Sequence, residues 1–182
     1  MSTPGPDYSN EILEVVDQYD RVIGTERRGV IHARGLMHRS AQVLLFNTPG
    51  QLFLQKRSLH KDEFPGLWDS SAAGHLAPGE SYHQCAVREL EEELGIRHGG
   101  ELTRLFKFSA SADTGFEHCT VFKCTSDKPL VLQPEEIDEG QWLSPAEMDA
   151  WVGNRHALLT PAIRRIWLRF RDLYKKRVSE IE

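Results

Sequence analysis

Three glutamates near the middle of the chain, Glu89, Glu92 and Glu93, are spaced so that a helix would carry all three carboxylates on one face. A helix is expected here because Ser81 and Gln84 have the spacing of a capping box at its start. Three adjacent like charges oppose helix formation, whereas a hard divalent cation is bound by oxygen ligands of this kind. Mg²⁺ is the first candidate and Mn²⁺ the second, and substrate phosphates commonly complete such a site. The spacing therefore predicts a metal site for pyrophosphate chemistry.

The residues around these glutamates favour the same interpretation. A loop of glycines and a proline begins at Gly74, and Glu80 and Arg88 flank the three carboxylates. Arg88 has forked donors, which can hold carboxylates in orientation without binding the metal itself. Gly95 is expected to end the helix, since C-cap positions favour a residue without a Cβ. The alternative is a solvated helix face, which is the ordinary meaning of clustered glutamates.

The stretch from Gly74 to Ile96 resembles the Nudix box. That pattern is a glycine, five residues, a glutamate, seven residues, Arg-Glu, an aliphatic residue, any residue, Glu-Glu, any residue, a glycine and an aliphatic residue. Every position matches, at Gly74, Glu80, Arg88, Glu89, Leu90, Glu92, Glu93, Gly95 and Ile96. The resemblance implies a three-layer α/β/α sandwich with a mixed sheet, of the α/β (α+β) class. It also implies metal ligation by Glu89, Glu92, Glu93 and the Gly74 carbonyl, with Glu80 and Arg88 in support.

Outside the box, about residues 15 to 145 resemble type I isopentenyl-diphosphate isomerases. The shared motifs are His38-Arg39-Ser40, Gln55-Lys56-Arg57, Pro65-Gly66-Leu67-Trp68-Asp69 and Gly74-His75. By this resemblance His38 and His75 match metal-binding histidines, and Glu117 matches a catalytic glutamate. Ala73 stands at the position of the isomerases' catalytic cysteine, and Gly115 replaces an acidic ligand. Because the box is intact here and degraded in the isomerases, hydrolysis is expected in place of isomerisation.

The predicted activity is a Mg²⁺-dependent pyrophosphohydrolase that cleaves a nucleoside diphosphate linked to another group. A metal-activated water would attack phosphorus. The expected catalytic residues are Glu89, Glu92, Glu93 and Glu117, and Glu92 and Glu117 are the two candidates for the general base. The alternatives are a noncatalytic Nudix protein that binds nucleotides or RNA, and an isopentenyl-diphosphate isomerase.

Four residues outside the box are candidates for binding the substrate. Arg57 and Lys56 follow a strand in a predicted hairpin and could present cations to a diphosphate. His38 and His75 could contact metal or phosphate, although a lone histidine is more often a hydrogen-bonded structural residue. The box leaves open the group attached to the diphosphate, because specificity depends on loops elsewhere.

Apolar runs of strand length predict the elements that must position these residues. The runs cover residues 12–16, 42–46, 52–54, 102–108 and 120–124. Helices are expected to begin after Ser81, Ser144 and Thr160, where capping signals stand. Residues 1–10 are expected to be a flexible tail, and residues 11–182 a single domain with a C-terminal amphipathic helix. Residues 160–178 of that helix hold seven basic residues and one acid, which indicates a solvated face or, alternatively, a surface for RNA or another anion.

Composition excludes several classes of protein. With 182 residues, 40% of them hydrophobic, and a net charge of −5, the chain is expected to be globular. It contains no apolar stretch long enough to cross a membrane, and its first ten residues lack the regions of a signal peptide. Three irregularly spaced cysteines are expected as thiols, which favours a cytoplasmic location. The expected partner is a small diphosphate substrate, without membrane or nucleic acid, and a homodimer is compatible with the resemblance.

Overall fold

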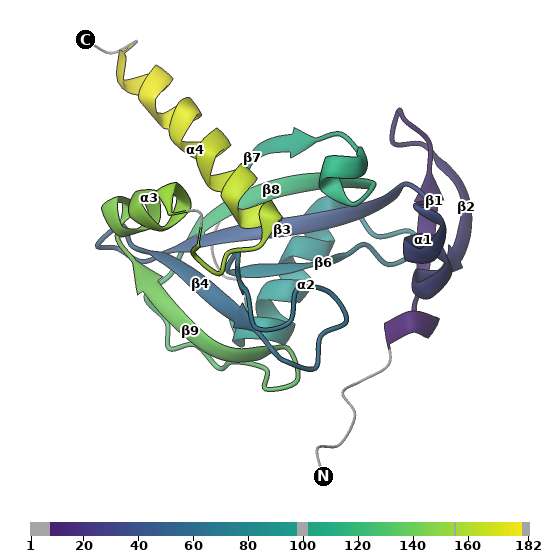
Figure 1. The fold of residues 1–182 in the computed structure, drawn as a ribbon, viewed down its shortest axis with the longest axis horizontal. Coiled ribbons are helices and arrows are strands. Elements are labelled where there is room, and N and C mark those ends of the chain that lie inside the picture. The colour runs from purple at the N-terminus through teal and green to yellow at the C-terminus, as the bar shows by residue number, and fades with distance from the viewer. Residues whose placement is uncertain (1–7, 98–101, 155, 180–182) are drawn as a thin grey trace.

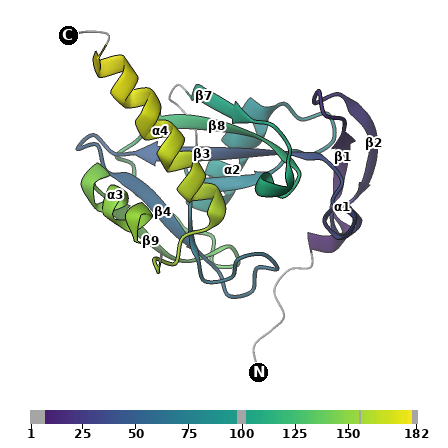
Figure 2. The same ribbon diagram turned by 45° about the horizontal axis from the view of Figure 1, so that its top comes forward.

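The computed structural model of this chain describes residues 8–97, 102–154 and 156–179. A mixed β-sheet forms the centre of the molecule, and helices cover both of its faces (Figures 1 and 2). The expected α/β (α+β) sandwich with a mixed sheet is confirmed. Within the described ranges, no helix combines the length and the apolar composition that crossing a membrane requires. Residues 1–7 of the expected tail lie outside the described residues, and Tyr8–Asn10 form a short 3₁₀ helix.

The main sheet is built around one long strand, β3 (His38–Phe46). β3 runs parallel to β8 (Glu117–Thr125) and antiparallel to β4 (Leu52–Arg57) and β6 (Ala72–His75). β7 (Thr103–Phe108) pairs with β8, while β5 (Trp68–Asp69) and β9 (Ile137–Leu143) pair with β4. A separate two-stranded sheet contains β1 (Ile12–Val16) and β2 (Val22–Arg27). Because β4 and β6 both flank β3 on the same side, the sheet divides there, and the site lies at this division.

The five apolar runs all form strands in the structure, as β1, β3, β4, β7 and β8. The sequence did not predict β2, β5, β6 or β9, and each of these lacks a continuous apolar signal. β2 is almost wholly exposed, and β6 consists of two alanines, a glycine and a histidine. Pairing with a neighbouring strand holds these segments in the sheets: β2 pairs with β1 directly before it, and β6 and β9 pair with strands distant in sequence.

The three predicted helices are present and begin at the expected residues. α2 (Tyr82–Leu94) and α3 (Pro145–Gly153) each start with a complete capping box, at Ser81 and Ser144. α4 (Pro161–Ser179) starts after Thr160, whose hydroxyl accepts a hydrogen bond from the Ile163 N–H. The sequence did not predict α1 (Arg28–Arg34), because this seven-residue helix has no side-chain cap.

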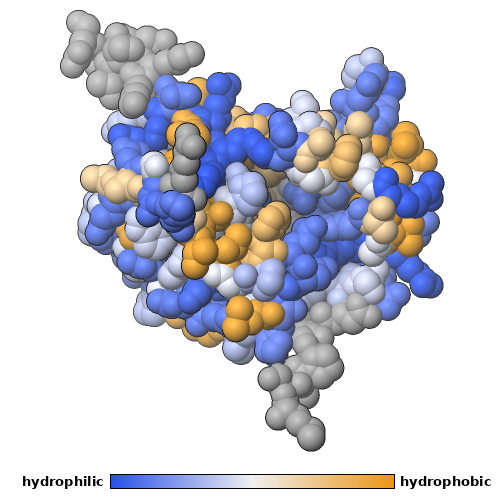
Figure 3. Space-filling view, viewed as in Figure 1, coloured by the Kyte–Doolittle hydropathy of each residue, from blue (hydrophilic) through white to orange (hydrophobic). Residues whose placement is uncertain are grey.

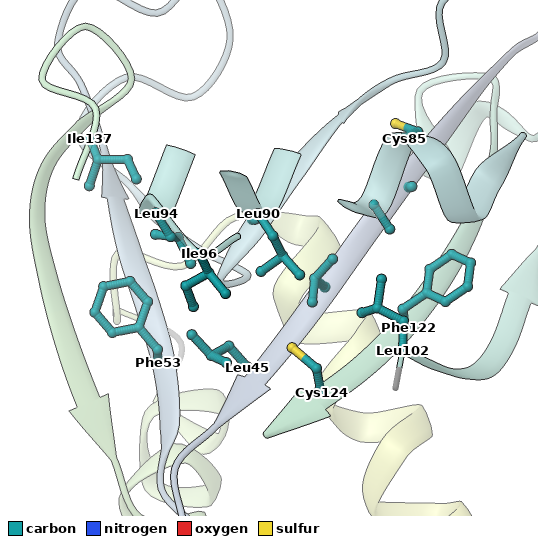
Figure 4. Packing of buried hydrophobic residues seen from close by; sticks show 14 of the residues in the cluster. Leu45, Phe53, Cys85, Leu90, Leu94, Ile96, Leu102, Phe122, Cys124 and Ile137 are labelled. Carbon is teal, nitrogen blue, oxygen red and sulfur yellow. The ribbon is translucent and has the colours of Figure 1, made fainter. Parts of the chain in front are cut away.

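The hydrophobic core lies in two clusters, one on each face of the sheet. Alternation along β3 sends Ala41, Val43 and Leu45 toward α2, and Leu44 and Phe46 toward α3 and α4. Figure 4 shows the first cluster, where Leu90 and Leu94 of α2 pack over the sheet. This packing fixes α2 against β3 and β6 and so fixes the carboxylates that α2 carries. The expected thiols are also confirmed, because Cys85, Cys119 and Cys124 are all free and buried.

Candidate active site

A cavity of about 550 Å³ opens between the box helix, the divided sheet and the start of α4. Its walls include the side chains of α2 that the sequence singled out, together with residues from β3, β6, β8 and the loops before β5 and β9. Figure 3 shows this face of the molecule, which is hollowed near its centre and bordered largely by hydrophilic residues. The cavity therefore has the polar lining expected of a site for a charged substrate.

Glu89 and Glu93 are buried at one wall of the cavity, with 8% and 5% of their surface exposed. The Glu93 carboxylate accepts hydrogen bonds from the Ala73 N–H at 3.0 Å and from Gln55 Nε2 at 2.8 Å. Glu89 packs directly on Gly74, where a Cβ would overlap its carboxylate. The glycine that begins the box is thus required by the close approach of this side chain to the backbone.

Burial raises the pKa of both carboxyl groups. The pKa of Glu93 rises to about 7, because burial disfavours its charge and Glu136 adds repulsion. The pKa of Glu89 also lies well above its ordinary value, because of burial and the neighbouring Glu93. Arg88 is shared between Glu89, Glu80 and Glu92, so it compensates the charge of the buried pair only in part. A divalent cation would supply the remaining positive charge.

Arg88 and Glu80 hold this wall in place. Arg88 donates from Nε and Nη2 to the two oxygens of Glu80, at 2.9 and 3.0 Å, and from Nη2 to the His75 carbonyl at 2.9 Å. Its Nη1 donates to Glu89 at 2.6 Å and to Glu92 at 3.1 Å. Both residues thus have the geometry of the supporting role that the sequence suggested. Glu92 differs from the other two box glutamates, because 58% of its side chain is exposed at the cavity wall.

Three histidines meet beside these carboxylates. His32 from α1, His38 from β3 and His75 from β6 each offer a ring nitrogen, and these atoms all lie within 4.8 Å of one another. His32 Nδ1 lies 3.0 Å from a Glu63 oxygen, and His38 Nδ1 lies 2.9 Å from the Leu36 carbonyl. The Nε2 atoms of both rings are buried and make no hydrogen bond to a described residue. In metal-binding histidines one ring nitrogen is held by an acceptor and the other faces the metal, and these two rings have that arrangement.

Glu117 faces the same cluster from β8. One of its oxygens lies 3.2 Å from His75 Nε2 and 3.6 Å from His38 Nε2. Burial alone would raise the pKa of Glu117, but the two imidazoles outweigh it and hold the pKa well below its ordinary value. The carboxylate therefore stays ionised, which suits a ligand better than a base. Three imidazoles and one carboxylate form a donor set that fits a transition metal such as zinc or manganese.

His32 is a residue of this cluster that the sequence analysis missed. It lies in the unpredicted helix α1, outside every motif that carried the resemblance. Its position six residues before His38 is the one signal in the sequence, and that spacing has no meaning without the structure of α1.

Cations line the cavity opposite the carboxylates. Arg57 is among them, with Nη1 3.4 Å from Asp69, and so are Arg28 and Lys61, which the sequence analysis did not single out. All three also pair with an acid: Arg28, which is 6% exposed, lies 3.0 Å from Asp62, and Lys61 pairs with Glu136.

Lys56, the other cation predicted to contact the substrate, is not among the described residues that line the cavity. Successive residues of a strand point to opposite faces, so Lys56 extends away from the cavity that Arg57 lines. Its ammonium group, 35% exposed, lies 3.5 Å from Glu139 of β9.

A family model described as the NUDIX domain matches residues 36–163. The chain belongs to this family. It is 42% identical over 135 residues to an uncharacterized Nudix hydrolase of Pseudomonas aeruginosa. The matched residues cover 74% of this chain and 79% of that protein. It is also 35% identical over 160 residues to the isopentenyl-diphosphate Delta-isomerase of Nocardia farcinica, covering 85% and 91% of the two chains. The predicted relationship to both groups is confirmed.

Among solved structures, DR0079 from Deinococcus radiodurans matches with a TM-score of 0.77 and 28% identity. The match covers 87% of this chain and 98% of that one. Nearly the whole of that protein thus shares the arrangement of sheet and helices described above.

Proposed function

We propose that this protein is a Mg²⁺-dependent pyrophosphohydrolase that cleaves a nucleoside diphosphate linked to another group. The observation that carries the proposal is the buried pair Glu89 and Glu93, which is held against the backbone at Ala73 and Gly74 and faces a cavity lined with cations. The intact box and the Nudix hydrolases among the relatives support it.

A divalent ion at this pair would lower the pKa of a coordinated water and neutralise the phosphate oxygens. The protein's own residues prepare the site for it. Arg88 holds Glu89 and Glu80 in fixed positions, so the carboxylates need little rearrangement. Arg28, Arg57 and Lys61 line the cavity from outside the box, where guanidinium and ammonium groups would hold a diphosphate in place.

Of the two candidates for the general base, we favour Glu92. Glu117 is held ionised by His38 and His75, and this makes it a weak proton acceptor. Glu92 lines the cavity, is more than half exposed and is restrained only by Arg88 among its hydrogen-bonding partners. It can therefore reach a water beside the buried pair.

We assign the His32, His38, His75 and Glu117 cluster to a second metal, of the transition series. Its support is the convergence of the three ring nitrogens, together with two buried Nε2 atoms that make no hydrogen bond to a described residue. Such nitrogens are costly unless something binds them. This cluster also relates the chain to the isomerases, but Ala73 offers no thiol for proton transfer at the place where they have one. We therefore favour hydrolysis over isomerisation.

The basic helix α4 gives little support for RNA binding. Arg164 donates to three backbone carbonyls, at Val152, Asn154 and Ala157. Arg165 donates to the Asp113 carbonyl, and Arg171 pairs with Asp149 at 2.9 Å. Because these cations already have intramolecular partners, we propose a small-molecule substrate and no nucleic-acid partner. The three thiols support a reducing compartment such as the cytoplasm.

The test is product release from a panel of nucleoside diphosphates, nucleotide sugars and isopentenyl diphosphate, with and without Mg²⁺. Glu93→Gln removes the buried carboxylate, and Glu91→Gln on the exposed side of the same helix is the matched control. We expect Mg²⁺-dependent cleavage by the wild type and by Glu91→Gln, and none by Glu93→Gln. Binding without cleavage of any compound, unaffected by Glu93→Gln, would favour a noncatalytic binder, and conversion of isopentenyl diphosphate into its isomer would favour an isomerase.

A further inference from the structure

The cavity has a second end, away from the box carboxylates and beneath the first turn of α4. Its floor is formed by Ser40 and Gln42 of β3 and by Cys119 of β8. Its cover is formed by Thr160, Pro161, Ala162, Arg165 and Ile166. Figures 1 and 2 both show the start of α4 crossing over β3 and β8. None of the motifs that identified the family assigns a role to this end.

β3 links the two ends of the cavity directly. His38, Ser40 and Gln42 alternate along the strand and so point to the same face. Each step of two residues advances about 7 Å along a strand. A substrate whose diphosphate lies at the carboxylates and histidines would therefore place its attached group over Ser40 and Gln42.

The floor of this end contains a buried hydroxyl without a strong hydrogen-bonding partner among the described residues. The Ser40 hydroxyl is buried and makes no hydrogen bond to a described residue, and its neighbour across the strands, the Cys119 thiol, is only a weak partner. Gln42 is 7% exposed, and its Oε1 accepts a hydrogen bond from the Ser70 hydroxyl at 2.8 Å. Gln42 lines the cavity on the same face of β3 as Ser40. Buried polar groups in folded proteins are nearly always paired, so the Ser40 hydroxyl points to a ligand that pairs with it. The Gln42 amide, on the same wall, can bond to that ligand as well.

The walls of the same end include apolar side chains. Phe108, Pro161 and Ile166 line it, and the Arg165 guanidinium lies 5.9 Å from the centre of the Phe108 ring. The cover is fixed in place, because the Thr160 hydroxyl at the start of α4 donates to buried Asp69 at 2.8 Å. A slot with apolar walls and a hydrogen-bonding floor fits a flat heteroaromatic ring, which buries its faces and pairs its edge.

We propose that Ser40 and Gln42 form the subsite for the group attached to the diphosphate, and that they make it select a hydrogen-bonding ring, such as a nucleobase, over an isoprenoid chain. This inference rests on the proposed function, because the diphosphate must lie at the carboxylates. An alkyl chain in the same place would leave the Ser40 hydroxyl buried without a strong partner and would cover the Gln42 amide without bonding to it, and such mismatches are strongly rejected.

The experiment measures binding, so that it does not depend on turnover. The probes are the uncleavable α,β-methylene analogues of adenosine, guanosine, cytidine and uridine diphosphates and of isopentenyl diphosphate, titrated calorimetrically with Mg²⁺ present. The variants are Ser40→Ala and Gln42→Leu, with Gln42→Met as a second apolar replacement and the exposed Gln141→Leu of β9 as the control. Thermal unfolding checks that each variant is folded.

We expect the wild type and Gln141→Leu to prefer one nucleoside analogue at least tenfold over isopentenyl. Each substitution in the subsite should weaken that nucleotide about tenfold or more and leave the isopentenyl analogue unchanged or tighter. Equal binding of all five analogues, or a nucleotide affinity that survives both Gln42 variants and Ser40→Ala, would overturn the inference. If the affinities follow expectation but no nucleotide is hydrolysed, the subsite stands and the proposed hydrolysis fails.

Discussion

The buried pair Glu89 and Glu93 should make the metal-free protein less stable as the pH rises. The pKa of Glu93 is about 7 in the folded chain against an ordinary value of 4.5. Between these values the unfolded chain loses its proton and the folded chain keeps it, so the free energy of unfolding falls across this window. The difference between the two pKa values corresponds to a contribution of roughly 3 kcal/mol to the free energy of unfolding, as an upper limit. This contribution is present in full below pH 4.5 and is lost above pH 7.

The assay is thermal unfolding in a metal chelator at pH 5, 6, 7 and 8. For a chain of this size about 1 kcal/mol moves the melting temperature by roughly 2–4 °C. The melting temperatures at pH 5 and pH 8 should therefore differ by up to roughly 6–12 °C. Glu93→Gln removes the ionisable group while its amide oxygen can still accept from Ala73 and Gln55. We expect the melting temperature of Glu93→Gln, relative to that of the wild type, to increase from pH 5 to pH 8.

Glu91→Gln is the control, because Glu91 lies on α2 with its side chain half exposed. Its melting temperatures should run parallel to those of the wild type at every pH. Saturating Mg²⁺ should restore the wild type at pH 8, since an ion bound only by the folded chain stabilises it. Parallel curves for the wild type and Glu93→Gln in chelator would refute the reasoning about the buried charge.

Three further substitutions test separate parts of the site. Gly74→Ala should displace the Glu89 carboxylate and weaken Mg²⁺ binding about tenfold or more, and an unchanged affinity in titration calorimetry would count against that contact. His32→Ala should lower the zinc or manganese retained after dialysis, measured by mass spectrometry, whereas equal metal content would exclude His32 as a ligand. Arg57→Ala should raise KM for a diphosphate substrate about 10- to 100-fold, and Lys56→Ala less than about twofold; equal effects would show that the cavity does not bind the diphosphate as described.

The sequence predicted the parts of the fold that local signals determine. The capping boxes at Ser81 and Ser144 fixed the starts of α2 and α3, because their hydrogen bonds form within a few residues. The spacing of the box placed Glu89 and Glu93 on one helix face for the same reason. What the sequence lacked was the orientation of that face, which depends on Gln55 and Ala73 from distant strands.

The rest of the site depends on contacts between distant segments. His32 joins the histidine cluster only because α1 packs beside the start of β3, and no local signal marks that packing. Arg28 and Lys61 look like surface cations in the sequence, yet both line the cavity. The choice between Lys56 and Arg57 turns on which face of β4 is covered, and this follows from the division of the sheet at β6.

The most direct measurement is hydrolysis of the preferred substrate in H₂¹⁸O with Mg²⁺, followed by mass spectrometry of both products. We predict that one phosphate-bearing product gains a single ¹⁸O in the wild type and in Glu91→Gln. In Glu93→Gln the rate should fall at least roughly a hundredfold. Products without the label, or full turnover in Glu93→Gln, would contradict attack of water on phosphorus at the carboxylates of α2.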